Sequence, residues 1–138
     1  MPAPLTVLLV TIAMMVVIWL FSVAMRNASI VDLFWGAGFV VGGWTYFIST
    51  ETATARKWMV VALVTAWGLR LSIHLFVRNR GTGEDYRYRE MRKKHASNFW
   101  WISLFTVFVL QGLIMWVVGL VLWVPMRATS PSGLTWID

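Results

Sequence analysis

Residues 67–94 read WGLRLSIHLFVRNRGTGEDYRYREMRKK and pass from apolar sequence into the most charged part of the chain. Positions 78–94 hold seven of the twelve Lys and Arg residues and three of the six acidic residues. On either side, long apolar runs are joined by short connectors. We therefore expect polar chemistry to centre on residues 67–94, and the other runs to form a membrane-embedded scaffold.

Composition places the protein in a bilayer. Only 13% of its 138 residues are charged, against about 25% in an ordinary soluble domain. A run of about 20 apolar residues crosses the hydrocarbon core as a helix. The sequence predicts one domain over residues 1–138, an all-α integral membrane bundle of four transmembrane helices with a basic cytoplasmic loop between helices three and four. The expected spans are residues 5–25, 30–48, 58–77 and 98–124.

The distribution of charge predicts the orientation of these spans. Lys and Arg accumulate in cytoplasmic loops, and the loop at residues 78–97 is the dominant positive segment. This loop is therefore expected in the cytoplasm and the N-terminus outside. The first basic residue, Arg26, follows the first apolar run, which favours an uncleaved helix over a signal peptide.

Several functional classes are disfavoured at this stage. The chain has no Cys, which excludes disulfides, thiolate metal sites and Cys nucleophiles. The net charge of +6 lies mostly in one loop beside the membrane and comes with no nucleic-acid-binding motif, so no nucleic-acid partner is expected. No carboxylate pair has metal-ligand spacing with His74 or His95, so no metal site is expected.

Polar residues inside the apolar runs are the first candidates for a binding site, because ionisable groups within a span are costly and often functional. Arg70, His74 and Arg78 are spaced four residues apart and share one helix face. Asp32 enters the membrane from the same side as Arg70, so the two side chains are expected to reach similar depth and to be able to pair. Such a pair is equally consistent with locking two helices and with contacting a ligand. In the last span, Gln111 needs a partner in protein, water or ligand.

Other residues indicate how the helices begin, end and pack. Gly38 and Gly42 form a small-xxx-small pair that allows two helices to approach closely. Asn27 and Ser29 are both candidate N-caps for the second span. Pro125 is expected to stop the last helix, because proline cannot continue the hydrogen-bond ladder.

The charged segment after the third span allows two interpretations. Gly81 and Gly83 permit a tight turn, and a partly helical segment is expected from Glu84 onward. Its alternating acids, bases and tyrosines are typical of an internally paired, solvated loop. They are equally typical of a phosphate-binding surface, because Arg binds phosphate bidentately and Tyr can cover an adenine or a ribose.

Three blocks of sequence carry a family resemblance: NASIVDLFWG at 27–36, WGLRLSIHLFVRNRGTGEDYRY at 67–88 and LQGLIMW at 110–116. Through them the chain resembles the steroid 5-alpha-reductase-like integral membrane family over residues 26–120, in a bacterial branch described as a domain of unknown function. The resemblance implies a bacterial inner-membrane location. It also implies reduction, with hydride from NADPH, of a C=C bond conjugated to a ketone in a lipid-like or steroid-like substrate.

Members of that family are roughly twice as long, so the resemblance implies that this chain is the N-terminal half of a longer fold and is not active alone. The main cofactor signature, an Arg-His-Pro-Asn-Tyr-like run, belongs to the second half. Trp67 stands where steroid-reducing relatives place a Tyr that polarises the ketone. An indole N–H can donate a hydrogen bond but is a poor acid, which disfavours a steroid substrate.

The site residues expected from motif and resemblance form two sets, and no catalytic residue is singled out. The residues expected to contact substrate are Asp32, Trp35, Trp67, Arg70, His74 and Gln111. Those expected to hold the NADPH phosphates are Arg78, Arg80, Glu84, Asp85, Arg87 and Tyr88.

Two other functions are compatible with the sequence. One is a small four-span transporter, although the first span lacks the ionisable residue that such proteins typically use. The other is a non-catalytic scaffold whose basic loop binds anionic lipid. The expected partners are the lipid bilayer, a lipid-like small molecule, and either a C-terminal half or a second copy of the chain.

Overall fold

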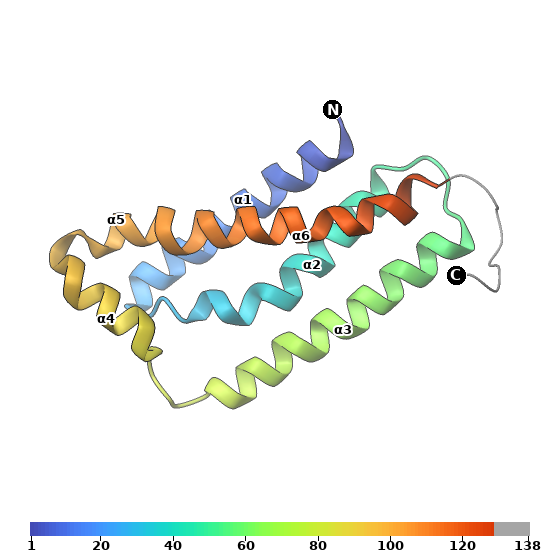
Figure 1. The fold of residues 1–138 in the computed structure, drawn as a ribbon. Helices are drawn as coiled ribbons and strands as arrows, with labels where there is room; N and C mark the ends of the chain where they lie inside the picture. The colour runs from blue at the N-terminus through green and yellow to red at the C-terminus, as the bar shows by residue number, and fades with distance from the viewer. Residues whose placement is uncertain (129–138) are drawn as a thin grey trace.

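Four long apolar helical segments cross one another in the computed structural model, which describes residues 1–128 (Figure 1). All four are long and apolar enough to span a membrane, so the predicted all-α, four-span architecture is confirmed and the protein is an integral membrane protein. In chain order the elements are α1 (Ala3–Met25), α2 (Ile30–Ile48), α3 (Ala55–Asn79), α4 (Tyr86–His95), the 3₁₀ turn η1 (Ala96–Asn98), α5 (Phe99–Ser103), the π-helical stretch η2 (Leu104–Val109) and α6 (Leu110–Arg127).

Some observed helix ends differ from the predicted ones by two or three residues. The second span has the predicted bounds, whereas α1 begins two residues earlier than predicted and α3 extends by three residues at its start and two at its end. The prediction that Pro125 stops the last helix was wrong, because α6 continues to Arg127. Proline removes a single backbone hydrogen bond and crowds the preceding turn. In the final turn of a helix this loss does not prevent two further residues from staying helical.

α2 is the central helix of the bundle. It packs against α1, α3 and α6, while α3 packs mainly on α2 and lies at one side of the bundle (Figure 1). Only Lys57, Val61 and Gly68 of α3 are buried, so most of its circumference faces away from the other helices. This outward face is available to lipid or to another molecule.

The crossing of α2 and α3 depends on two glycines. A Cβ atom added to Gly68 would lie 2.5 Å from the carbonyl oxygen of Gly36, far inside van der Waals contact. Next to this crossing, the Ala37 N–H donates a hydrogen bond of 3.0 Å to Ser72 Oγ. The backbones of α2 and α3 therefore touch directly, which fixes the rotation of α3 about its axis.

The predicted small-residue pair has a different role from the one expected. Gly38 makes room for the Met115 side chain of α6, and a Cβ on Gly42 would lie 3.5 Å from Val7 of α1. The backbone-to-backbone approach occurs instead at Gly36 and Gly68. Sequence spacing alone does not tell which of several glycines faces a neighbouring backbone.

We predict that Gly68→Ala lowers the thermal stability of the protein in detergent. The added methyl group must push α2 and α3 apart, and overpacking of this kind costs about 1–3 kcal/mol. This exceeds the gain of about 0.5–1 kcal/mol from replacing a helical glycine by alanine. Unfolding followed by tryptophan fluorescence measures the difference.

The matched control is Gly43→Ala, because a Cβ at Gly43 meets only ordinary contacts, the nearest 3.5 Å away at Val64. This variant is expected to keep or slightly raise the melting temperature. Equal melting temperatures for the two variants would contradict the assigned crossing.

Candidate functional site

The charged segment folds back over the end of the bundle at which α2 begins. After α3, the chain turns through Gly81 (φ 81°) and Gly83 (φ 72°), and both angles lie in the left-handed region that glycine tolerates best. Asp85 then caps α4 by accepting a 2.9 Å hydrogen bond from the Arg87 N–H. The predicted turn and helical segment are both present, and they bring α4 across the ends of α2 and α5 (Figure 1).

A chain of hydrogen bonds centred on Tyr88 joins α2, α4 and α6. The Tyr88 hydroxyl, in a residue only 6% exposed, donates to Asp32 Oδ1 at 3.0 Å. It accepts from Gln111 Nε2 at 3.1 Å. The Gln111 Oε1 atom in turn accepts from Trp35 Nε1 at 2.5 Å. Each of these four side chains has a protein partner, so the hydrogen-bond network stabilises the bundle end without a ligand.

Glu84 attaches the same segment to the residues that precede α2. Its Oε1 atom accepts hydrogen bonds from the Ala28 N–H and from Arg92 Nη2, both at 2.8 Å. The neighbouring Asp85 N–H donates to Ser29 Oγ at 2.6 Å. Ser29 does occupy the N-cap position of α2, but its hydroxyl binds Asp85 instead of an N–H of α2.

The electrostatics of this attachment favour ionised carboxylates. Burial raises the pKa of Glu84, but the Arg92 guanidinium, the Ala28 N–H and the charge of Arg89 together outweigh burial and hold this pKa below its ordinary value. Hydrogen bonds from Arg87 lower the pKa of the Asp85 carboxyl. Both groups therefore carry a negative charge at neutral pH and keep their cationic partners in place.

The expected pairing of Asp32 with Arg70 was wrong. Asp32 binds Tyr88 and lies 3.5 Å from Arg87 Nη2, although α2 and α3 are neighbours as that prediction required. The reason is the rotation of α3. Gly68 faces α2, and at 3.6 residues per turn Arg70 lies about 200° further around the helix. Its side chain therefore points away from Asp32.

Arg70 instead lines a hollow on the outward face of α3. Trp67, Arg70, Leu71 and His74 line this hollow, which has a volume of about 350 Å³. Within residues 1–128, no hydrogen bond or ion pair involves the side chains of Arg70 or His74, and both residues are exposed. The indole of Trp67 packs edge-on against Phe39 of α2, at a centroid distance of 5.7 Å.

The predicted substrate residues thus fall into two groups. Asp32, Trp35 and Gln111 belong to the internal hydrogen-bond chain, whereas Trp67, Arg70 and His74 share the hollow on α3. The members of the internal group bind one another, so most of their hydrogen-bonding capacity is used within the protein. Only the α3 group combines access with unused hydrogen-bonding capacity.

The predicted cofactor residues do not fit the phosphates of a dinucleotide as a set. Glu84, Asp85, Arg87 and Tyr88 are used in the contacts described above, which leaves Arg78 and Arg80 exposed. The hollow beside them has a volume of about 250 Å³. Its lining residues are Ser29, Asn79, Thr82, Gly83, Glu84, Asp85, Tyr86 and Arg89. A phosphate placed there would meet two carboxylates, which repel it.

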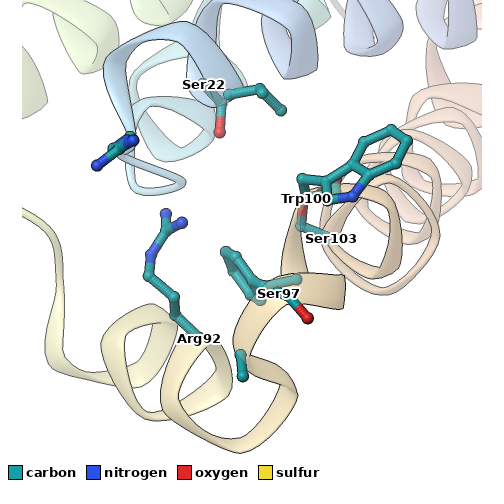
Figure 2. A pocket seen from close by; sticks show the side chains of 9 residues that line it. Ser22, Arg92, Ser97, Trp100 and Ser103 are labelled. Atoms are coloured by element: carbon teal, nitrogen blue, oxygen red, sulfur yellow. Dashed lines mark hydrogen bonds between the residues drawn. The ribbon is translucent and has the colours of Figure 1, made fainter.

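Sequence reasoning missed a larger pocket at the same end of the bundle, where α1, α4 and α5 meet (Figure 2). It has a volume of about 440 Å³ and contains two arginines from distant parts of the chain. Its lining residues are Ser22, Val23, Arg26, Arg92, Ala96, Ser97, Phe99, Trp100 and Ser103. Arg26 was noted only as the first basic residue, and nothing in the sequence places it beside Arg92.

A family comparison covers all of these sites. The family described as "Protein of unknown function (DUF1295)" matches residues 18–138. The chain belongs to this family. The match confirms the domain of unknown function expected from the sequence. No curated protein and no solved structure matches this DUF1295 chain.

We predict that Glu84→Gln lowers stability at neutral pH and has little effect in acid. Losing a charged hydrogen-bond partner costs about 1.5–3 kcal/mol. The folded-state pKa of Glu84 lies below its ordinary value of 4.5, so its contribution is complete above that value and is lost as the pH falls through the folded pKa. Melting temperatures of both proteins from pH 7 to pH 3 should therefore converge at the acidic end.

Glu51→Gln provides the control, since Glu51 is exposed in the connector between α2 and α3. It makes the same chemical change and should leave the melting curves unaltered at every pH. A stability difference for Glu84→Gln that persists undiminished at pH 3 would argue against stabilisation by an ionised Glu84.

Proposed function

We propose that this chain binds the carbonyl end of a lipid-like, α,β-unsaturated ketone, as the substrate-binding part of a membrane-embedded reductase. The observation that carries the proposal is the hollow on α3, where Trp67, Arg70 and His74 face outward from the bundle. The likeness of residues 67–88 to the steroid 5-alpha-reductase-like family supports the class of reaction.

The position of Arg70 supports a polar ligand at this face. It lies nine residues before the end of α3 at Asn79, which is about 13 Å along the helix. A guanidinium at such depth is costly unless it reaches water or pairs with a polar group. Hydrocarbon tails provide no acceptor, whereas a ketone oxygen does.

The chemistry available in the hollow suits a carbonyl group. Arg70 presents several N–H donors and Trp67 presents its indole N–H. Reduction of a conjugated C=C bond places negative charge on the ketone oxygen, and donors fixed around that oxygen stabilise the charge as it develops. His74, one helical turn beyond Arg70, adds an imidazole that can donate or accept a hydrogen bond on the same face.

The proposal assigns only the carbonyl-binding part to this chain. NADPH, the expected cofactor, supplies a hydride when bound, but the residues predicted to hold its phosphates do not fit it as a set. The hollow is also lined from α3 alone. The complete site therefore needs a second wall, from a further helical segment or a second copy of the chain.

We predict that Arg70→Gln weakens binding of a long-chain α,β-unsaturated ketone by about 10- to 100-fold, the effect of losing one hydrogen bond from a charged donor. The measurement is equilibrium binding of the ketone to protein in lipid nanodiscs, with the alkane of equal length as the competitor that lacks an oxygen. The alkane should bind both proteins equally.

Arg78→Gln is the matched control, because Arg78 lies on the same face of α3 two turns further on and outside the hollow. It removes the same charge and should change ketone affinity by less than about twofold. Equal weakening by the two substitutions, or equal affinity for ketone and alkane, would contradict the proposed site.

We also predict that the chain alone binds NADPH more weakly than micromolar, since four of its six candidate phosphate ligands, Glu84, Asp85, Arg87 and Tyr88, are already bonded within the protein. Isothermal titration calorimetry of purified protein with NADPH tests this directly. Micromolar binding that is abolished by Arg80→Gln would show that the basic segment holds the cofactor after all.

A further inference from the structure

The pocket between α1, α4 and α5 brings two cationic side chains to one space. Arg26 ends α1 and Arg92 projects from α4. Figure 2 shows the Arg92 guanidinium and the Ser22 hydroxyl pointing toward the same space, with Trp100 at its side. No acidic residue lines the pocket, and its volume of about 440 Å³ lies in the range of about 300–1,000 Å³ typical of small-molecule sites.

Arg92 is held in position with donors to spare. Its Nε and Nη2 atoms bind Glu84 at 3.1 and 2.8 Å, and its guanidinium carbon lies 4.4 Å from the centroid of the Phe99 ring. An arginine has five N–H donors, so these two bonds leave three unused. The side chain is thus fixed from two sides and can still bind an anion.

Arg26 and Ser22 add unpaired groups on the opposite wall. Within residues 1–128, neither the Arg26 guanidinium nor the Ser22 hydroxyl makes a hydrogen bond, although Ser22 is only 3% exposed. Arg26 (φ 50°) and Ala96 (φ 43°) are also the two non-glycine residues with positive φ in that range, and both line this pocket. Such backbone strain concentrates at functional sites.

The pocket lies at the level expected for lipid headgroups. It occupies the end of the bundle that carries the basic segment, which the sequence predicts to be cytoplasmic. Trp100 is exposed there and its ring stacks on that of Trp19. The Trp19 indole N–H also donates a hydrogen bond of 2.8 Å to the Trp100 carbonyl oxygen. Tryptophans of this kind mark the membrane interface. Basic pockets at such a level bind anionic lipid headgroups.

We propose that Arg26, Arg92 and Ser22 form a binding site for the phosphate group of an anionic phospholipid. The two guanidiniums approach the phosphate oxygens from opposite walls, because Arg donors match phosphate geometry. The Ser22 hydroxyl donates a further hydrogen bond. This site is separate from the hollow on α3 and does not depend on the proposed ketone binding.

The test uses the full chain in a neutral detergent and native mass spectrometry to count bound lipids during titration with phosphatidylglycerol, phosphatidylcholine or glycerol 3-phosphate. The wild-type protein should retain one phosphatidylglycerol with higher affinity than phosphatidylcholine. Arg26→Gln should weaken that binding by about tenfold or more, the loss expected for a charged hydrogen bond. Arg26→Lys should recover part of it, because the charge returns.

Arg80→Gln is the control, since it removes the same charge from an exposed position of the same segment outside the pocket. Its effect should stay below about twofold. Equal losses for Arg26→Gln and Arg80→Gln would show diffuse attraction and overturn the site, as would the absence of any retained lipid. Binding of glycerol 3-phosphate as tight as that of phosphatidylglycerol would overturn the lipid source and assign the site to soluble phosphates.

Discussion

The bundle end depends on two carboxylates that anchor the charged segment to the start of α2. Asp32 accepts a hydrogen bond from the Tyr88 hydroxyl, and Glu84 accepts hydrogen bonds from the Ala28 N–H and the Arg92 guanidinium. These bonds place α4 across the ends of the membrane helices and bring Arg92 to the wall opposite Arg26. Apolar burial contributes less to this packing, because Tyr88 is the one buried residue of α4 and Met91 is only partly buried against the same core.

A second constraint, the contact of Gly36 with Gly68, sets what α3 shows to its surroundings. Once Gly68 faces α2, the helical period turns Arg70 and His74 outward. The polar residues of the second and third spans are thereby separated, with Asp32 in an internal network and Arg70 at the bundle surface. One backbone approach therefore decides which membrane-embedded charge is structural and which remains free for a ligand.

The sequence predicted the helices well and the partners of their polar residues poorly, for a physical reason. Span length and hydropathy are local properties, so the four spans, the glycine turn and α4 could be predicted from composition and spacing. The partner of Asp32 depends on helix rotation and on how the charged segment folds back, and neither follows from spacing. For the same reason the pocket lined by Arg26 and Arg92 could not be predicted, since its two cations meet only in the tertiary structure.

The unpaired polar groups lie where the two proposed ligands would bind. At the centre of the bundle end, the polar side chains are hydrogen-bonded to one another. These are Trp35, Gln111, Tyr88 and Asp32. Unused donors lie at its edges, on the outward face of α3 and between α1 and α4. Both edges border the region that lipid occupies around a membrane protein. A ligand that is itself dissolved in the bilayer can reach either edge from the membrane. It need not disturb the hydrogen bonds of Asp32 and Glu84 that hold the charged segment in place.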